Sequence, residues 1–238
     1  MKTEIKFIPL VIFLCVLTFW NLEAKAQDYL PVGPQTNVPV ATVTEGGWTE
    51  CYRDTYENHM DADMVLADCP GSQLMLACRE TGSETLMLLA QGERSDVTFD
   101  TGNDNDDVLH IANGVGWYFN DMGVDVFGDA WGYVRAGDSV EKNNCDVDSS
   151  GANDERLCWH LHGNGGYRCG SIGNDDEGPN LNGGPDAERY ERIVYVLSDV
   201  PPPPVEKVPT LSEWGLMAMA GVLGIISLLA IRRRKVTA

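Results

Sequence analysis

An uncharged apolar run near the C-terminus constrains this chain more than any other stretch. The eighteen residues from Trp214 to Ile231 carry no charge and one hydroxyl, that of Ser227. As a helix they would extend about 27 Å, enough to cross the hydrocarbon core of a bilayer once. Four cationic residues follow directly, namely Arg232, Arg233, Arg234 and Lys235. Because Lys and Arg beside a membrane helix stay on the cytoplasmic side, we expect the bulk of the chain to lie outside.

A short motif stands directly before this predicted membrane segment. It consists of Val208, Pro209, Thr210, Leu211, Ser212, Glu213, Trp214 and Gly215. Pro209 lacks a backbone donor and keeps Val208 extended, which leaves the segment open to a protease. The motif resembles the IPTL-CTERM sorting signal, whose pattern is Ile-Pro-Thr-Leu-Ser-Glu-Trp-Gly, and departs from it only at Val208. The resemblance implies a substrate of a membrane-embedded, exosortase-type cysteine transpeptidase in Gram-negative bacteria that make exopolysaccharide. It covers about thirty residues and implies nothing about the rest.

The N-terminus has the pattern of a secretory signal peptide, residues 1–26. Lys2 and Lys6 precede an apolar run from Phe7 to Trp20, and an Ala-x-Ala cleavage site ends at Ala26. Cys15 lies within the apolar run and would leave with the peptide. We therefore expect an exported chain that begins near Gln27.

Composition divides the remainder of the chain into four parts. Residues 27–47, rich in Pro, Thr and Val, predict an extended lead-in, and residues 48–200 are long enough for one domain with its own core. Residues 201–207 open with four prolines, which predict a stiff polyproline spacer. Residues 208–238 hold the sorting motif, the membrane segment and the basic tail.

The middle of the chain is strongly acidic. Residues 27–200 contain nine Lys and Arg against 32 Asp and Glu, a net charge of -23, whereas the whole chain has -19. Such a field repels phosphate backbones, so nucleic acid is not expected as a partner. It attracts cations, although a solvated acidic surface that keeps an exported protein soluble is the simpler explanation.

Six cysteines remain once the signal peptide is removed. They are Cys51, Cys69, Cys78, Cys145, Cys158 and Cys169. An even number in an exported domain predicts up to three disulfides, with fifteen pairings open. The spacing lacks the paired Cys-x2-Cys units of zinc sites.

Short apolar runs separated by Gly, Asn and Asp clusters predict a mainly β domain. The runs cover residues 74–79, 85–91, 97–99, 115–119, 131–135, 157–161 and 193–197. Their β-branched and aromatic content favours a disulfide-bonded antiparallel β-sandwich or barrel-like fold. Only Leu74 to Leu89 rivals this as a helix, and Gly82 interrupts it. Residues 48–66 are polar without a clean period.

One acidic loop imitates a calcium-binding loop. Asp146, Asp148, Ser150 and Asp154 place oxygen ligands at relative positions 1, 3, 5 and 9, with Gly151 at position 6. Leu157 stands where a bidentate Glu would be needed, so Ca²⁺ competes with an ordinary acidic loop. Cys145 and Cys158 bracket the loop and would pin it if they formed a disulfide.

Other ligand candidates are less ordered. Asp100, Asp104, Asp106 and Asp107 form one acidic cluster and residues 175–177 another, and each also fits a solvated turn. His160 and His162 would share one face of a strand, where a third ligand would complete a zinc site, but no motif supplies it. His59 and His110 stand alone in the sequence.

The aromatic residues of the domain have two readings. Trp48, Trp117, Tyr118, Trp131 and Trp159 would stack on sugar rings if exposed on one face, or form the core if buried. Trp117 to Phe119 are expected to alternate between the two faces of one strand.

No arrangement in the sequence predicts catalysis. Gly-x-Ser-x-Gly, His-Glu-x-x-His and phosphate-loop motifs are all missing from the sequence. We therefore expect a non-enzymatic surface or extracellular-matrix protein that is anchored in the membrane at least transiently. A carbohydrate- or calcium-binding adhesion module with extracellular polysaccharide as partner, and a secreted hydrolase, are the alternatives.

Overall fold

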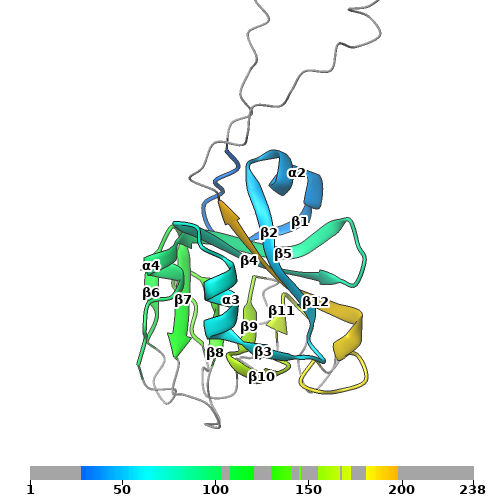
Figure 1. Ribbon diagram of the computed structural model, residues 1–238. Helices are drawn as coiled ribbons and strands as arrows, with labels where there is room; N and C mark the ends of the chain where they lie inside the picture. Colours follow the sequence, from blue (N-terminus) through cyan, green and yellow to red (C-terminus); the bar gives the residue numbers. More distant parts are fainter. Residues whose placement is uncertain are drawn as a thin grey trace, which may run out of the picture. The chain divides into compact units, whose positions relative to one another are not determined.

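Antiparallel sheets form most of the domain in the computed structural model (Figure 1). The structure describes residues 28–102, 108–120, 130–140, 145, 155–166, 168–172 and 181–197. All of these belong to the first of two units, residues 1–199, and the second unit lies outside the described residues. The prediction of a mainly β, antiparallel and disulfide-bonded domain is confirmed.

The first sheet has five strands in the order β1-β5-β4-β12-β2. Its strands are β1 (Gln35–Pro39), β2 (Trp48–Thr55), β4 (Gln73–Glu80), β5 (Thr85–Glu93) and β12 (Tyr190–Leu197). Every neighbouring pair is antiparallel. Gly82, with φ of +76°, lies in the tight turn between β4 and β5, so this stretch is a hairpin and not a helix.

The second sheet has five strands in the order β11-β9-β8-β7-β6. Its strands are β6 (His110–Ala112), β7 (Val115–Asn120), β8 (Ala130–Arg135), β9 (Leu157–His160) and β11 (Arg168–Cys169). Asn113 and Gly114, with φ of +51° and +72°, connect β6 to β7. Two left-handed residues in a two-residue loop match the twist of the flanking strands, which is why Asn-Gly suits this position.

Short elements complete the domain. They are β3 (His59–Asp61), β10 (His162–Asn164), α2 (Val40–Glu45), α3 (Ala62–Asp68), α4 (Arg94–Val97) and η2 (Ala187–Arg189). β3 and β10 pair with each other at the end of the domain opposite α2 (Figure 1). The carboxylate of Asp61 accepts a hydrogen bond from Met64 N at 3.1 Å and so caps the start of α3.

The main core lies between the two sheets. It joins alternate residues of β4, β5 and β12 to the large aromatic residues of β7, β8 and β9. Trp117 and Phe119 enter this core, whereas Tyr118 joins a cluster on the other face of β7. The expected alternation along this strand is therefore confirmed.

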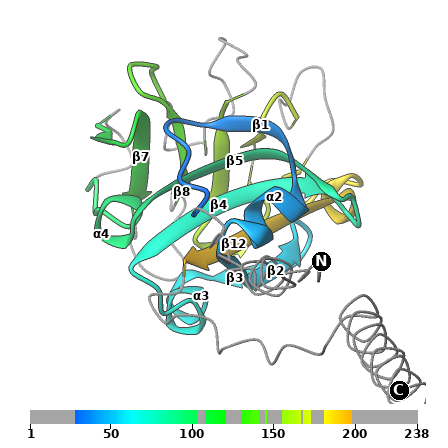
Figure 2. The same ribbon diagram turned by 90° about the horizontal axis from the view of Figure 1, so that it is seen from above.

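A second cluster covers the outer face of the first sheet. Helix α2 lies on this face (Figure 2), and its Val43 packs with Trp48, Met75 and Tyr195. Residues 27–47 were expected as an extended lead-in, but the structure builds β1 and α2 from them. The sequence of these residues has too few apolar side chains to predict either element. They fold because β1 pairs with the free edge of β5 and α2 covers the apolar outer face of the first sheet.

Two further local expectations differ from the structure. The run 97–99 was expected as a strand, yet Val97 ends α4, and its carbonyl accepts a hydrogen bond from Trp131 Nε1 at 3.0 Å. The polar stretch 48–66 contains β2, β3 and most of α3. The pairing of β2 with β12 shifts register between Val194, which lies opposite Tyr52, and Tyr195, which lies opposite Glu50. This irregularity interrupts the alternation of inward and outward side chains along β2, so the sequence does not show a strand pattern there.

All six cysteines of the domain form disulfides. Cys51 is bonded to Cys69, Cys78 to Cys169 and Cys145 to Cys158, with Cα separations of 5.3, 5.8 and 5.5 Å. The prediction of up to three disulfides is confirmed, and the structure selects one of the fifteen open pairings, in which Cys145 and Cys158 bracket the acidic loop. Cys78 lies on β4 and Cys169 on β11, so this bridge connects the two sheets.

None of the helices among the described residues is long and apolar enough to cross a membrane. The predicted membrane segment, 214–231, and the predicted signal peptide, 1–26, lie outside the described residues.

Candidate functional site

Most of the residues singled out for chemistry lie outside the described part of the chain. This applies to the sorting motif 208–215, to the basic tail 232–235, to the acidic residues 175–177, and to Asp146, Asp148, Ser150 and Asp154 of the calcium-like loop. Of the other acidic cluster only Asp100 is described, and its carboxylate accepts a hydrogen bond from Gly102 N at 2.8 Å. Asp100 thus serves a local turn.

The two neighbouring histidines do not share a strand. His160 ends β9, where it lies opposite Ala130, and His162 begins β10, where it lies opposite Asp61. Leu161 between them is fully buried. The expectation of one strand face is therefore wrong, because the chain turns at Leu161 and passes to another sheet. Within the described ranges, no three His, Cys, Asp or Glu side chains are grouped to hold a metal ion.

His110 makes contacts that the sequence did not reveal. Its Nε2 lies 2.8 Å from Asp96 Oδ1, and its ring stacks on Phe99 with the ring centroids 4.3 Å apart. The three residues come from α4, the segment after it and β6. This contact ties the edge strand of the second sheet to α4. Asp96 precedes His110 by fourteen residues, and no spacing rule would pair them.

The five aromatic residues considered for sugar stacking are core residues. Trp117, Tyr118, Trp131 and Trp159 are fully buried and Trp48 is 2% exposed. Trp131 meets Phe119 and Trp159 edge-to-face, with centroid distances of 5.6 and 5.8 Å. Because a sugar ring needs an accessible aromatic face, these five residues do not form such a platform.

Arg192 of β12 is the most unusual charged residue in the core. Its guanidinium donates to three main-chain carbonyls, those of Thr55 at 3.1 Å, Asn58 at 2.5 Å and Gly165 at 3.2 Å. It also lies over the ring of Tyr56, 5.6 Å from the centroid. Burial lowers the pKa of Arg192 from its ordinary value, which the nearby Tyr52, Tyr56 and Asp54 partly oppose. The side chain thus connects the end of β2, the turn after it and the residue after β10 to strand β12.

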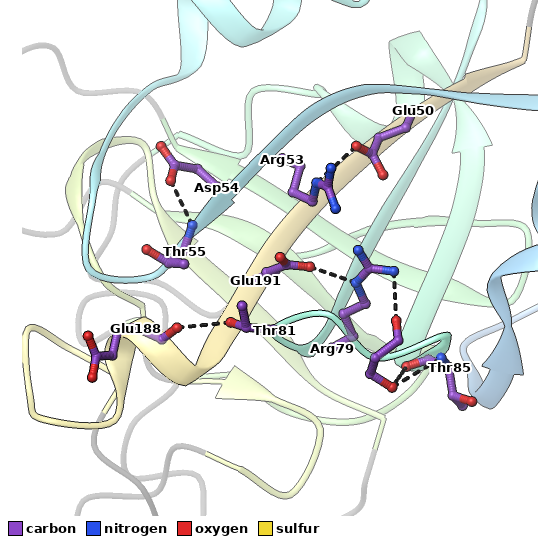
Figure 3. A network of polar contacts seen from close by, with 10 residues as sticks. Glu50, Arg53, Asp54, Thr55, Arg79, Thr81, Thr85, Glu188 and Glu191 are labelled. Atoms are coloured by element: carbon purple, nitrogen blue, oxygen red, sulfur yellow. Dashed lines mark hydrogen bonds and ion pairs between the residues drawn. The ribbon is translucent and has the colours of Figure 1, made fainter.

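Arg79 and Glu191 form a buried ion pair on the other face of the same sheet (Figure 3). They are direct neighbours across β4 and β12, with Arg79 Nε 2.6 Å from Glu191 Oε2. Arg79 also donates to the carbonyl of Ser83 at 2.8 Å. Charge-assisted bonds of this kind fix the register of the two strands.

Every arginine among the described residues is either buried or bonded. Arg79, Arg156, Arg168 and Arg192 are buried. Arg53, Arg135 and Arg189 are exposed, and each is paired with a carboxylate, those of Glu50, Glu155 and Asp186. The half-buried Arg94 donates to the carbonyl of Gly71 at 2.8 Å. The arginine side chains of the described residues therefore already have partners within the domain. The groups that remain for binding a partner are carboxylates.

The two ends of the described chain meet at Gly47. A side chain at this position would lie 3.2 Å from Leu197 Cδ1 and 3.3 Å from Asp28 Oδ1. Tyr29 N donates to Gly46 O at 2.9 Å, and Trp48 Nε1 donates to Tyr29 O at 2.7 Å. An open hollow adjoins this point, lined by Asp28, Tyr29, Leu30, Pro31, Thr42, Glu45 and Gly46. The two carboxylates that line it, those of Asp28 and Glu45, do not define a reaction.

Comparison with known proteins identifies the tail. The family model of the IPTL-CTERM motif matches residues 208–234, which include the sorting motif, the apolar run and the first three basic residues. The resemblance inferred from Val208 to Gly215 is confirmed. No curated protein and no solved structure matches the chain. The match suggests a C-terminal sorting signal of an exported protein.

Proposed function

We propose that this protein is exported across the inner membrane and sorted to the cell surface or extracellular matrix, where its acidic domain acts without enzymatic activity. The observation that carries the proposal is the IPTL-CTERM match at residues 208–234. An exosortase-type transpeptidase at the membrane is the partner that this signal implies. The tail holds the chain in the membrane until the enzyme acts.

The chemistry of the tail supports this order of events. Pro209 lacks a backbone donor and disfavours a helix at Val208, which is compatible with a motif that a protease has to bind. The apolar run 214–231 matches one bilayer crossing, and the basic residues after it favour a cytoplasmic C-terminus.

The disulfides support export of the domain. Bridges of this kind form and persist on the oxidising side of the inner membrane and are rare in the cytoplasm. One of them, Cys78 to Cys169, closes a separation of 91 residues and lies in the shared core. A chain that folded in the cytoplasm would lack this bond.

The bonding of the buried arginines and the packing of the aromatic residues support a structural role for the domain. Arg192 and Arg79 bind carbonyls or a neighbouring carboxylate inside the domain, and the large aromatic residues fill the core. What the described residues present to partners is a carboxylate-rich surface. Such a surface suits a component that stays hydrated in a matrix.

Mass spectrometry of the mature protein from its host tests the proposal, because it fixes both termini at once. We expect an N-terminus near Gln27 and a C-terminus within or near 208–215. A protein that retains residues 232–238 in full, or that stays in the cytoplasm with free thiols, would contradict it.

Two substitutions in the motif sharpen this test. Pro209→Ala should leave uncut chain in the membrane fraction, because the motif can then continue the helix. Val208→Ile restores the residue of the family pattern and serves as the matched control, which should be processed like the wild type. Equal processing of both variants would show that the motif is not what the enzyme reads.

A further inference from the structure

The loop between β6 and β7 contains one of three Asn-Gly pairs in the chain, which are Asn113-Gly114, Asn164-Gly165 and Asn182-Gly183. In such a pair the main-chain nitrogen of glycine can attack the side-chain carbonyl carbon of asparagine, because glycine has no Cβ to shield that nitrogen. The nitrogen gives up its proton and bonds to the carbon, and the amide nitrogen leaves as ammonia. Water then opens the resulting succinimide to aspartate or isoaspartate.

The side-chain amide of Asn113 is held by main-chain carbonyls from distant parts of the domain. Its Nδ2 donates to Pro31 O and to Gln91 O, each at 2.9 Å, which uses both hydrogens of the amide. Gln91 Nε2 also donates to Pro31 O at 2.9 Å, and Gly33 N donates to Asn113 O at 2.8 Å. These four hydrogen bonds form the Asn113 clamp, which ties residues 29–33 and β5 to the second sheet.

The three Asn-Gly pairs differ in how their glycine nitrogens are bonded. Gly165 N donates to Tyr56 O at 2.6 Å and Gly183 N donates to Leu181 O at 3.1 Å, so each of these nitrogens is already held by a hydrogen bond. Gly114 is exposed to water, and among the described residues none accepts a hydrogen bond from its nitrogen. The protection of this pair therefore depends on the clamp, which fixes the asparagine side chain.

We propose that Asn113 is a deamidation site that the closed clamp protects, and that its conversion releases residues 29–33 from the second sheet. Aspartate or isoaspartate at this position has no amide donor, and its carboxylate would face the carbonyl oxygens of Pro31 and Gln91. Both carbonyls would lose a donor and meet a negative charge in its place. The modification needs water as its one co-reactant, and the inference does not depend on the sorting function.

Peptide mapping by mass spectrometry follows the three pairs separately, because cleavage after arginine places them in different peptides. The purified protein is incubated at mildly alkaline pH with its disulfides intact, and in parallel after reduction in urea. We expect conversion of Asn113 in the folded protein to be at least about tenfold slower than in the unfolded protein, because it requires local opening of the clamp. Equal rates in the two samples, or no conversion in either, would overturn the proposal.

Gln91→Leu tests the clamp itself, since it removes the second donor to Pro31 O and keeps a side chain of similar size. In the folded protein we expect conversion of Asn113 to become at least about threefold faster while conversion of Asn182 stays at the wild-type rate. Gln73→Leu, the same change on the neighbouring strand, is the matched control and should alter neither rate. An unchanged rate at Asn113, or an equal increase at both asparagines, would contradict the protective role of the clamp.

Asn113→Asp tests the consequence of the modification. We expect hydrogen exchange at the Gly33 amide, which donates to Asn113 O, to become at least about tenfold faster, because the segment that carries it is released. Exchange at Ala77, in the middle of the first sheet, should stay at the wild-type rate. Wild-type exchange at Gly33 would show that the carboxylate releases nothing, and equal acceleration at Ala77 would assign the effect to global unfolding; either result rejects the release.

Discussion

Arg192 is a buried cation whose hydrogen bonds go to carbonyls and not to a carboxylate. Two of its acceptors, Thr55 and Asn58, lie close together at the end of β2, and the third, Gly165, lies far from them in the sequence. An arginine fork satisfies several acceptors at once because its donors are fixed in one plane. The residue therefore organises the loops around the small sheet of β3 and β10.

Replacing Arg192 by Met should destabilise the protein by about 2–4 kcal/mol, because three buried acceptors lose their donor while the apolar stem is kept. Urea unfolding of the purified protein measures the change. Arg53→Met is the matched control: Arg53 is exposed and pairs with Glu50 at the surface, and its loss should cost about 0.5 kcal/mol or less. Equal costs for the two variants would contradict the role given to Arg192.

The buried tyrosines predict a limit at alkaline pH. Burial raises the pKa of Tyr195 to about 12 and also raises the pKa of Tyr56 and Tyr133. Above about pH 10 the unfolded chain loses these protons while the folded chain keeps them, so stability falls as pH rises. We expect the free energy of unfolding to decline steadily above about pH 10, with tyrosinate absorbance appearing together with unfolding. Tyrosinate formation in the folded state at that pH would contradict the prediction.

At the level of elements, the strands that a sequence can predict are those buried on both faces. β7 and β8 are rich in aromatic residues and are buried along most of their length, and the structure places them inside the second sheet. β1 and β2 lie at the two edges of the first sheet, where half of the side chains meet solvent. Their sequences carry little periodic signal, and pairing with β5 and β12 decides their structure.

The disulfide and ion-pair partners of the domain could be predicted from the sequence less well than its strands. Cys145 and Cys158 were a candidate pair because they bracket one loop, although fifteen pairings remained open, whereas Cys78 and Cys169 are neighbours only because β4 and β11 belong to different sheets. Arg79 and Glu191 are likewise adjacent through the register of β4 and β12. Such partners depend on topology, which local sequence does not contain. The sorting motif was recognisable because its function resides in contiguous residues.

The disulfide that joins the two sheets should contribute more stability than the one that joins β2 to Cys69, the residue directly after α3. The sequence separations are 91 and 18 residues, for which loop-closure entropy gives about 4.6 and about 3.2 kcal/mol. We expect Cys78→Ala with Cys169→Ala to lower the urea midpoint further than Cys51→Ala with Cys69→Ala. The reverse order would show that folded-state packing and not chain entropy dominates.

For the molecule as a whole, charge is distributed unequally between core and surface. Residues 27–200 carry a net charge of -23, and the arginines of the described residues are buried or paired. The remaining carboxylates repel one another across the surface. This repulsion weakens when salt shortens the Debye length to about 10 Å at 0.1 M.

We expect the melting temperature to rise by about 2–4 °C for each 1 kcal/mol of repulsion that added NaCl screens. Thermal unfolding in NaCl and in CaCl₂ at matched ionic strength measures it. Equal curves indicate screening alone, whereas a rise confined to low concentrations of Ca²⁺ would favour a specific calcium site. A melting temperature that falls with NaCl would contradict the charge argument.

The meeting of Asp28 and Leu197 at Gly47 has a practical consequence. A domain whose first and last residues lie close together can be inserted into a surface loop of another protein without separating the two ends of that loop. The segment between these two residues should thus be portable as a guest, still oxidised and still folded, in any secreted carrier protein.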